Sequence, residues 1–365
     1  LCSLATLVTY AEMMLPNSWI VVVGVFVQLS HQTDFLCQDT NNADVDWLIG
    51  YKMPKVDALG ALYAQGLQLF TLTSNAANAW AKITNAINAR DQPLETTLRP
   101  YYAAVNDADT LKIWYDSSTV SIPDCPLTPS KGVIMGKQGN FFMMQHSVNG
   151  FPLKDAYNWP TTDDAVNNAQ IVICMSLAES TLKPIVEGLQ YETPLVYLKH
   201  LPDAFKVAPF TDLVDGKPSV KQTTTMSTVF KTKPVTPAEQ GTFTLYTMKS
   251  KSKRNLFSQL LAPAMQSSLT AWTKATEEKY CQGPFSIVPL SGKIDVTSGA
   301  DVVPITREKD GSRWLITTVD TKNVWCFTNS DFSKERLPCG ALCLENANVH
   351  GLFKTAAATG TLAKC

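Results

Sequence analysis

The sequence predicts a mixed α/β or α+β chain with a large hydrophobic core. Hydrophobic residues make up 45% of its 365 residues and charged residues only 17%, a composition typical of globular rather than disordered proteins. Segments with strand-like alternation and segments with helical spacing occur in both halves of the chain, which favours a mixed architecture. Lys and Arg total 31 against 32 Asp and Glu, so any polyanion contact needs a local basic patch.

Residues 1–36 are interpreted as a leader that is not part of the fold. They contain no Lys or Arg and include the nine-residue apolar run 19–27. A membrane span needs roughly 20 apolar residues, so this run fits the centre of a signal peptide that starts at Met13 or Met14 and is cleaved between residues 30 and 36. A buried strand is the alternative interpretation. The leader predicts a secreted, extracellular protein without a membrane segment in its mature form.

Eight cysteines follow the leader, and an even number in a secreted chain favours disulfide bonds. Their spacing contains no CxxC pair, and the chain has only four histidines, so we expect no zinc site and no other cofactor. The eight cysteines are Cys37, Cys125, Cys174, Cys281, Cys326, Cys339, Cys343 and Cys365.

In the first half, alternating and β-branched residues predict a series of strands. The predicted strands are 45–53, 111–115, 132–135, 140–146 and 170–177. A hairpin-like turn at 136–139 joins the third and fourth of these strands because Gly occupies both of its ends. The segment 58–88, rich in Ala, Leu and Asn, is expected to be helical in part, and 180–189 to be a short helix.

In the second half, the Thr-, Lys- and Pro-rich segment 202–240 predicts loops with edge strands. The pattern at 256–275 is the clearest helical one, although Pro263 interrupts it. The remaining predicted strands are 242–248, 286–290 and 313–319. A strand begins with Ser, a basic residue, and Gly or Trp at both 130–132 and 312–314, a faint internal echo between the two halves.

Several short blocks follow one another along the chain in a recognisable order. They are Val45-Asp-Trp47 with Tyr51-Lys52 and Pro54, Lys131-Gly-Val133, His146-Ser-Val148 with Phe151-Pro152, Tyr157-Asn-Trp159-Pro160, 170–176 around Cys174, 194–197, Arg313-Trp314, Cys326 and Leu342-Cys343. Their number, order and spacing resemble the DNase II family over nearly the whole mature chain. The sequence is also similar to the divergent secreted DNase II-like proteins of parasitic nematodes such as Trichinella.

The resemblance implies a phospholipase D-like fold: two pseudo-symmetric αβ halves around mixed sheets, expected here at 37–190 and 191–365. Each half of such a protein gives one H-x-K motif to a shared active site. One histidine attacks phosphorus and forms a phosphohistidine, the other protonates the leaving oxygen, and the lysines hold the non-bridging oxygens. The resemblance implies no metal in this chemistry.

Both motifs depart from the family pattern at their first residue. The first reads Pro129-Ser130-Lys131 and the second Gly311-Ser312-Arg313. Proline and glycine carry no side chain that can attack phosphorus or donate a proton, and a serine hydroxyl needs an adjacent base. The departure predicts a catalytically inactive protein. The cations Lys131 and Arg313, together with Ser130 and Ser312, are expected to retain phosphate binding.

His146 is the residue that opposes the prediction of inactivity. It lies in the best-matched block, where the resemblance implies a histidine near the active site. Residual acid or base catalysis by His146 is one interpretation. The other is a buried histidine that is hydrogen-bonded to the backbone, since one imidazole cannot fill two roles.

The resemblance also implies disulfide pairings by position: Cys37 with Cys174, Cys281 with Cys365, and Cys326 with Cys343. Cys125 and Cys339 remain, and the resemblance does not say whether they pair. Each bond that closes a long loop contributes roughly a few kcal/mol to stability.

The densest basic run consists of Lys249, Lys251, Lys253 and Arg254. It is interpreted as a solvated loop before a helix, with a contact patch for nucleic acid or a sulfated glycan as the alternative.

The sequence therefore predicts a secreted DNase II-like pseudoenzyme whose partner is DNA or another polyanion, bound weakly, beside protein partners that it does not identify. A homodimer is compatible with the family. The first alternative is an active, metal-independent acid endodeoxyribonuclease that leaves 3′-phosphate ends. The second is a structural or immunomodulatory secreted protein.

Overall fold

The computed structural model describes residues 35–103, 106–116, 129–236, 240–249, 252, 255–274, 281, 283–319, 321–332 and 338–362. The described residues belong to one compact unit, Asp34–Cys365. Phe35 and Leu36, which the sequence analysis assigned to the leader, are buried, so the fold begins slightly earlier than expected. None of the helices in the described ranges has the length and apolar character needed to cross a membrane.

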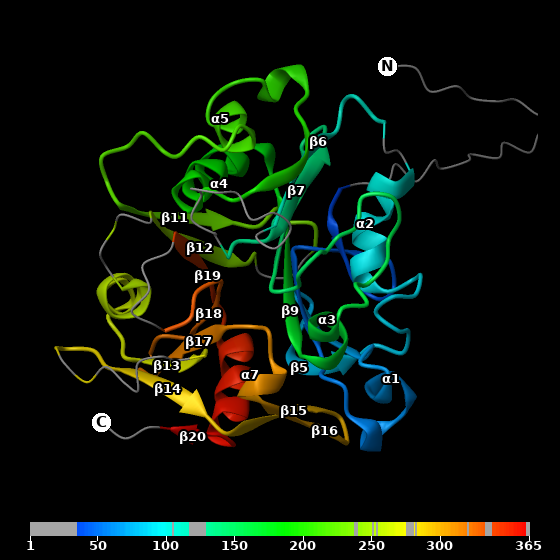
Figure 1. The fold of residues 1–365 in the computed structure, drawn as a ribbon, viewed down its shortest axis with the longest axis vertical. Helices are drawn as coiled ribbons and strands as arrows, with labels where there is room; N and C mark the ends of the chain where they lie inside the picture. Colours follow the sequence, from blue (N-terminus) through cyan, green and yellow to red (C-terminus); the bar gives the residue numbers. More distant parts are fainter. Residues whose placement is uncertain are drawn as a thin grey trace, which may run out of the picture. The chain divides into compact units, whose positions relative to one another are not determined.

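The first of two eight-stranded sheets is built from the first half of the chain (Figure 1). Its strand order is β10-β6-β7-β8-β9-β3-β4-β5, and every neighbouring pair is antiparallel. The strands are β3 (Trp47–Lys52), β4 (Leu69–Thr73), β5 (Ala76–Lys82), β6 (Leu111–Tyr115), β7 (Gly132–Lys137), β8 (Asn140–His146), β9 (Gln170–Leu177) and β10 (Val196–His200). All five strands predicted for this half are present.

The second sheet has the order β11-β12-β19-β18-β17-β13-β14-β20. Its neighbours are antiparallel except for β13 and β14, which are parallel. The strands are β11 (Thr225–Lys231), β12 (Thr242–Met248), β13 (Leu269–Trp272), β14 (Ile287–Ser291), β17 (Trp314–Thr317), β18 (Val324–Thr328), β19 (Cys339–Glu345) and β20 (Thr361–Leu362).

Two small two-stranded sheets and several helices complete the described elements. The small sheets pair β1 (Cys37–Gln38) with β2 (Asp44–Val45), and β15 (Lys293–Ser298) with β16 (Asp301–Thr306). The helices are α1 (Ala61–Ala64), α2 (Pro93–Ala103), α3 (Asp163–Asn167), α4 (Glu179–Glu192), α5 (Phe210–Val214), α6 (Ala262–Met265) and α7 (Ala347–Ala358). Shorter turns are η1 (Asp57–Leu59), η2 (Asp203–Phe205), the π-helical η4 (Phe257–Leu261) and η5 (Arg307–Lys309).

The two large sheets repeat one arrangement. The order β6-β7-β8-β9-β3-β4 in the first sheet corresponds to β13-β17-β18-β19-β12-β11 in the second. A helix follows the corresponding strand each time, α4 after β9 and α7 after β19. The segments 129–131 and 311–313 precede β7 and β17, which are equivalent strands. The internal echo read from the sequence therefore marks a structural repeat, as a fold of two related αβ halves requires.

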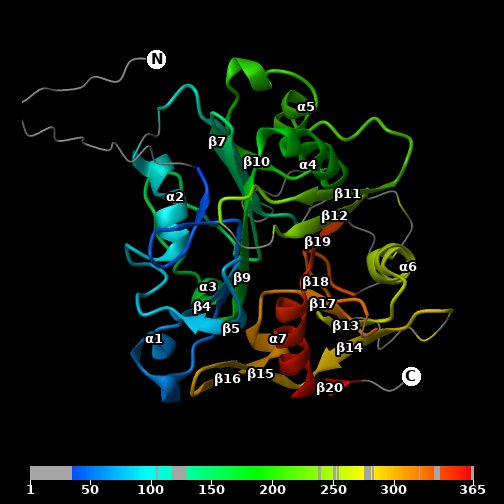
Figure 2. The same ribbon diagram turned by 180° about the vertical axis from the view of Figure 1, so that it is seen from behind.

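A shared core joins the two sheets. One apolar cluster contains Ile171, Ile173 and Met175 from β9 together with Leu342 and Leu344 from β19. The intervening residues of each strand enter separate clusters on the outer faces of the two sheets. Both central strands are thus buried on both faces, which explains why they read as continuous apolar runs. α4 packs against β11 and β12, and α7 against β5, β15 and β18, as the reverse view shows for α7 (Figure 2).

Two disulfide bonds join the pairs that the resemblance implied. Cys37 is bonded to Cys174 and ties β1 to β9, and Cys326 is bonded to Cys343 across the neighbouring strands β18 and β19. Cys281 is also disulfide-bonded, but its expected partner, Cys365, lies outside the described residues. Cys125, whose pairing the resemblance does not specify, lies outside them as well.

The segment 58–88 is helical in part, as expected: α1 is its α-helical portion, and β4 and β5 form a hairpin in the remainder. The helix predicted at 256–275 was too long. Along 256–275 the helical part ends at Met265, Gln266 takes a left-handed backbone conformation, and the following residues form β13 in the interior of the second sheet. In both places, pairing with strands distant in sequence outweighs local helix propensity.

Candidate functional site

The two motif segments meet where the two halves of the fold touch. Ala169, directly before β9, forms an isolated parallel bridge with Asp310 of the second half. The Gly311 amide donates to the Ala169 carbonyl at 2.8 Å, and the Ala169 amide donates to the Lys309 carbonyl at 2.8 Å. These backbone bonds fix the second motif against the first sheet, so the two cation positions lie in one region.

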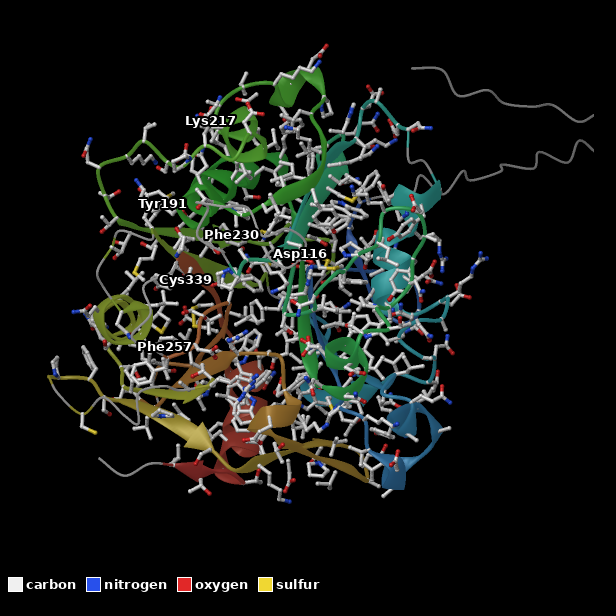
Figure 3. The ribbon with its side chains drawn as sticks, viewed as in Figure 1. Asp116, Tyr191, Lys217, Phe230, Phe257 and Cys339 are labelled. Carbon is white, nitrogen blue, oxygen red and sulfur yellow. A yellow bond between two sulfur atoms is a disulfide. The ribbon has the colours of Figure 1, made fainter. Side chains whose placement is uncertain are left out.

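Lys131 ends the first motif and directly precedes β7. Its ammonium makes one long contact, 3.4 Å, to the Pro129 carbonyl oxygen. Burial lowers the pKa of Lys131, the charge of Asp116 opposes this, and the Arg313 guanidinium adds to the lowering. This repulsion places the two motif cations within electrostatic reach of each other. Asp116 directly follows β6 and lies near the centre of the view in Figure 3.

His146 ends β8 and is 1% exposed. Its Nδ1 lies 3.1 Å from the Val148 carbonyl oxygen, so Nδ1 carries the proton and Nε2 is left as an acceptor. Burial lowers the pKa of His146 to about 4, the charge of Asp116 opposes the shift, and that of Lys131 reinforces it. The ring is therefore a buried, neutral imidazole hydrogen-bonded to the backbone, which is the second of the two interpretations given to it.

Ser130, the middle residue of the first motif, is buried beside Glu192. Glu192 ends α4 and is fully buried. Its Oε2 accepts a hydrogen bond from the side-chain amide (Nδ2) of Asn329 at 2.6 Å. Burial raises the pKa of Glu192 to about 7, and the hydrogen bonds from Asn329 and Ser130 act in the opposite direction. Glu192 thus links the first motif to the loop after β18 in the second half.

Gly311 stands where the second histidine is expected, and the space for a side chain there is already filled. A Cβ atom on Gly311 would lie 2.4 Å from Nε2 and 2.6 Å from Oε1 of Gln170. The Gln170 amide is fixed in this position, because it donates to Asp164 Oδ2 at 3.1 Å and accepts from the Ser147 hydroxyl at 2.5 Å. Any side chain at position 311 has to displace a buried, hydrogen-bonded amide.

Asp310 and Arg307 hold the backbone of the second motif. The buried Asp310 carboxylate accepts from the Tyr51 hydroxyl at 2.5 Å, the Trp272 indole at 2.7 Å and the Ser312 amide at 2.7 Å. The Arg307 guanidinium donates to the Ser312 carbonyl oxygen at 2.7 Å and lies over the Trp272 ring. Ser312 is therefore part of a packed network inside the fold.

Arg313 forms a bidentate ion pair with Asp331. Its Nε donates to Oδ1 at 2.7 Å and its Nη2 to Oδ2 at 2.9 Å. The two side chains are 27% and 24% exposed, so the pair lies near the surface. The Arg313 guanidinium, which was expected to bind a phosphate through two N–H groups, binds the Asp331 carboxylate instead.

The other candidate residues lie elsewhere. The Lys249 ammonium donates to the carbonyl oxygens of Ser219 and Lys221, while Lys251, Lys253 and Arg254 lie outside the described residues. His200 and His350 turn their Nε2 atoms to the carbonyl oxygens of Ala108 and Thr317. Of the histidines in the described ranges, only His146 lies beside a motif.

Sequence reasoning missed the residues that fill the site. Gln170, Glu192 and Asp331 are each distant in sequence from the motif residue beside which they lie, and Asn329 reaches the first motif through Glu192. No local pattern distinguishes these four residues. Together with the motifs they form a site that keeps two cations but presents no exposed imidazole in the part of the chain that the structure describes.

Comparison with known proteins gives a consistent result. The family model described as Deoxyribonuclease II matches residues 36–361. Plancitoxin-1 of Acanthaster planci is 26% identical over 347 residues, which cover 91% of this chain and 93% of that protein. Cell-death-related nuclease 7 of Caenorhabditis elegans is 22% identical, with 87% and 85% covered, and Deoxyribonuclease-2-beta of Mus musculus is 24% identical, with 87% and 89% covered.

Proposed function

Because this chain belongs to the deoxyribonuclease II family, whose fold is phospholipase D-like, we propose that it is a secreted, catalytically inactive member of that family that binds phosphate-bearing polyanions weakly. The observation that carries the proposal is the chemistry of the two motif positions. Pro129 and Gly311 supply neither a nucleophile nor a proton donor, while Lys131 and Arg313 remain as cations near each other.

The surroundings of the motifs support inactivity beyond the two missing imidazoles. The Gln170 amide fills the space beside Gly311. His146 is buried, with Nδ1 at the Val148 carbonyl and the ring edge-on to Phe151 at 5.5 Å between centroids. For His146 to act on a substrate, the ring would have to leave this position. Loss of the nucleophile from a covalent mechanism commonly lowers the catalytic rate by roughly 10⁴- to 10⁶-fold.

Digestion of supercoiled plasmid at acidic pH in EDTA tests the proposal. The parent protein is compared with a variant that carries Pro129→His, Gly311→His and Arg313→Lys, and with a matched control that adds Lys131→Ala to that variant. We expect no nicking by the parent. Activity in the restored variant, lost again in the control, would show that the scaffold is intact and that the Gln170 amide moves aside for a side chain at position 311.

Nicking by the parent that persists through stringent purification would overturn the proposal in favour of an active acid endodeoxyribonuclease. In that case His146→Asn identifies the source, because Asn retains a donor for the Val148 carbonyl but has no imidazole. Loss of nicking in this variant would assign the activity to His146.

A further inference from the structure

The ion pair of Arg313 with Asp331 restricts the binding of a phosphate to Arg313. A carboxylate and a phosphate both present two oxygen atoms to the parallel N–H groups of a guanidinium. Asp331 satisfies this geometry through two bonds of 2.7 and 2.9 Å. A phosphate group that uses the same two donors of Arg313 has to take the place of that carboxylate.

Asp331 is held in this place by the turn that carries it. The side-chain amide of Asn329 donates to Glu192 Oε2. The backbone N–H of Asn329 donates to the Gly340 carbonyl oxygen, and the Gly340 N–H donates to Asn329 Oδ1. On the other side, the Phe332 amide donates to the Thr273 hydroxyl at 3.2 Å, and the Phe332 side chain is buried. The Lys274 amide donates to Oδ1 of Asp331 at 2.8 Å. The carboxylate is thus preorganised for Arg313.

We propose that Asp331 is an internal anion that occupies the Arg313 half of the phosphate site and competes with an external phosphodiester for it. This inference rests on the proposed function, since it concerns the same site. It predicts weak polyanion binding in the parent because the ligand has to displace a tethered carboxylate. The partial exposure of both side chains allows this displacement without unfolding of the core.

The same turn reaches the first motif. Asn329, two residues before Asp331, is bonded to Glu192, and Glu192 lies beside Ser130. One short segment of the second half is therefore bonded to the second motif directly, through Asp331 at Arg313. It is linked to the first motif indirectly, through Asn329 and Glu192. The charge of Arg313 also acts on Lys131, whose ammonium lies 3.4 Å from the Pro129 carbonyl oxygen.

The test is the binding of a fluorescently labelled single-stranded DNA oligonucleotide in EDTA at neutral pH and low salt, measured by anisotropy. Asp331→Asn removes the charge but keeps the oxygen that accepts from the Lys274 amide. The matched control is Asp107→Asn, because Asp107 pairs with Lys137 at 2.6 Å with similar exposure, at the opposite end of β7 from Lys131. Both substitutions change the net charge equally.

We expect Asp331→Asn to bind the oligonucleotide about fivefold more tightly than the parent, as the loss of a partly exposed ion pair allows, and Asp107→Asn to leave the affinity within about twofold. The double variant Asp331→Asn with Arg313→Ala should not bind the oligonucleotide more tightly than the parent, because the guanidinium freed by the first substitution is then absent. Circular dichroism and urea unfolding verify that each variant is folded.

Three results would overturn the inference: a folded Asp331→Asn protein with unchanged or weaker binding, an equal gain in Asp107→Asn, or a gain that persists without Arg313. None of these depends on catalysis. The plasmid assay tests inactivity separately, so nicking by the parent rejects the proposed function while leaving the competition between Asp331 and the ligand to be decided by binding.

Discussion

The two motif segments occupy equivalent places in a repeated fold, yet they have become different. At the first, Lys131 has one long contact to a carbonyl oxygen and lies within reach of Asp116. At the second, Arg313 is paired with Asp331, the Gln170 amide fills the space beside Gly311, and Asp310 anchors Ser312. The first segment retains a loosely held cation, whereas the second has become part of the internal packing.

The two segments lack a histidine at the same motif position, yet the contacts around that position differ between the two halves. At the first position, Lys131 keeps a 3.4 Å contact to the Pro129 carbonyl oxygen. A glycine at the second position allows a side chain from the other half to approach within 2.4 Å of where its Cβ would lie. The second segment therefore contributes to stability through its contacts with Gln170, Asp310 and Asp331.

The largest expected effect is on stability when Asp310 is changed. Asp310→Asn removes a buried charge that three donors share, and we expect it to lower the free energy of unfolding by about 4 kcal/mol. Lys131→Met at the first motif should change it by less than about 1 kcal/mol, since burial already disfavours the charged ammonium. Urea unfolding at pH 7 measures both; equal losses would contradict the contrast between the segments.

The second largest expected effect is that Glu192 and His146 make the free energy of unfolding depend on pH in opposite directions. The pKa of Glu192 is raised to about 7, so its contribution to stability is complete below its ordinary pKa and is lost as pH rises to about 7. The pKa of His146 is lowered to about 4, so its contribution is complete above its ordinary pKa and is lost as pH falls towards 4. Each change amounts to about 3 kcal/mol.

These two dependences oppose each other between pH 4 and 7, so the parent should show a nearly flat stability profile from this pair. Glu192→Gln should leave a protein that is destabilised as pH falls, and His146→Asn one that is destabilised as pH rises. Unfolding free energies from pH 4 to 8 measure this. Parallel profiles for the two variants would show that these groups do not control the pH dependence.

The smallest expected effect separates two glycines. Gly311→Ala places a Cβ against the Gln170 amide and should destabilise the protein by about 1 to 2 kcal/mol. Gly351→Ala, inside α7 where nothing lies within 4 Å of the new Cβ, should stabilise it by about 0.5 to 1 kcal/mol. Thermal unfolding distinguishes the signs; a gain from Gly311→Ala would mean that Gln170 moves away without cost.

The sequence determined the central strands and their repeat, because β-branched and apolar runs such as β9 carry their own signal. The order of the family blocks predicted two disulfide pairs that the structure contains. Local patterns did not determine the segments 58–88 and 256–275, where helix-forming residues became β4, β5 and β13. The identity of a strand in a sheet depends on partners that local propensity cannot include.

At the site, the sequence by itself determined that Pro and Gly stand at positions 129 and 311 and that Lys and Arg stand at positions 131 and 313. Only the tertiary structure decided that Arg313 is paired with Asp331, that Gln170 lies against Gly311, and that the His146 ring is enclosed with its Nδ1 on a carbonyl oxygen. The physical reason is that these contacts join residues from different strands and loops. Their strength depends on burial and distance, which exist only after the two sheets have packed together.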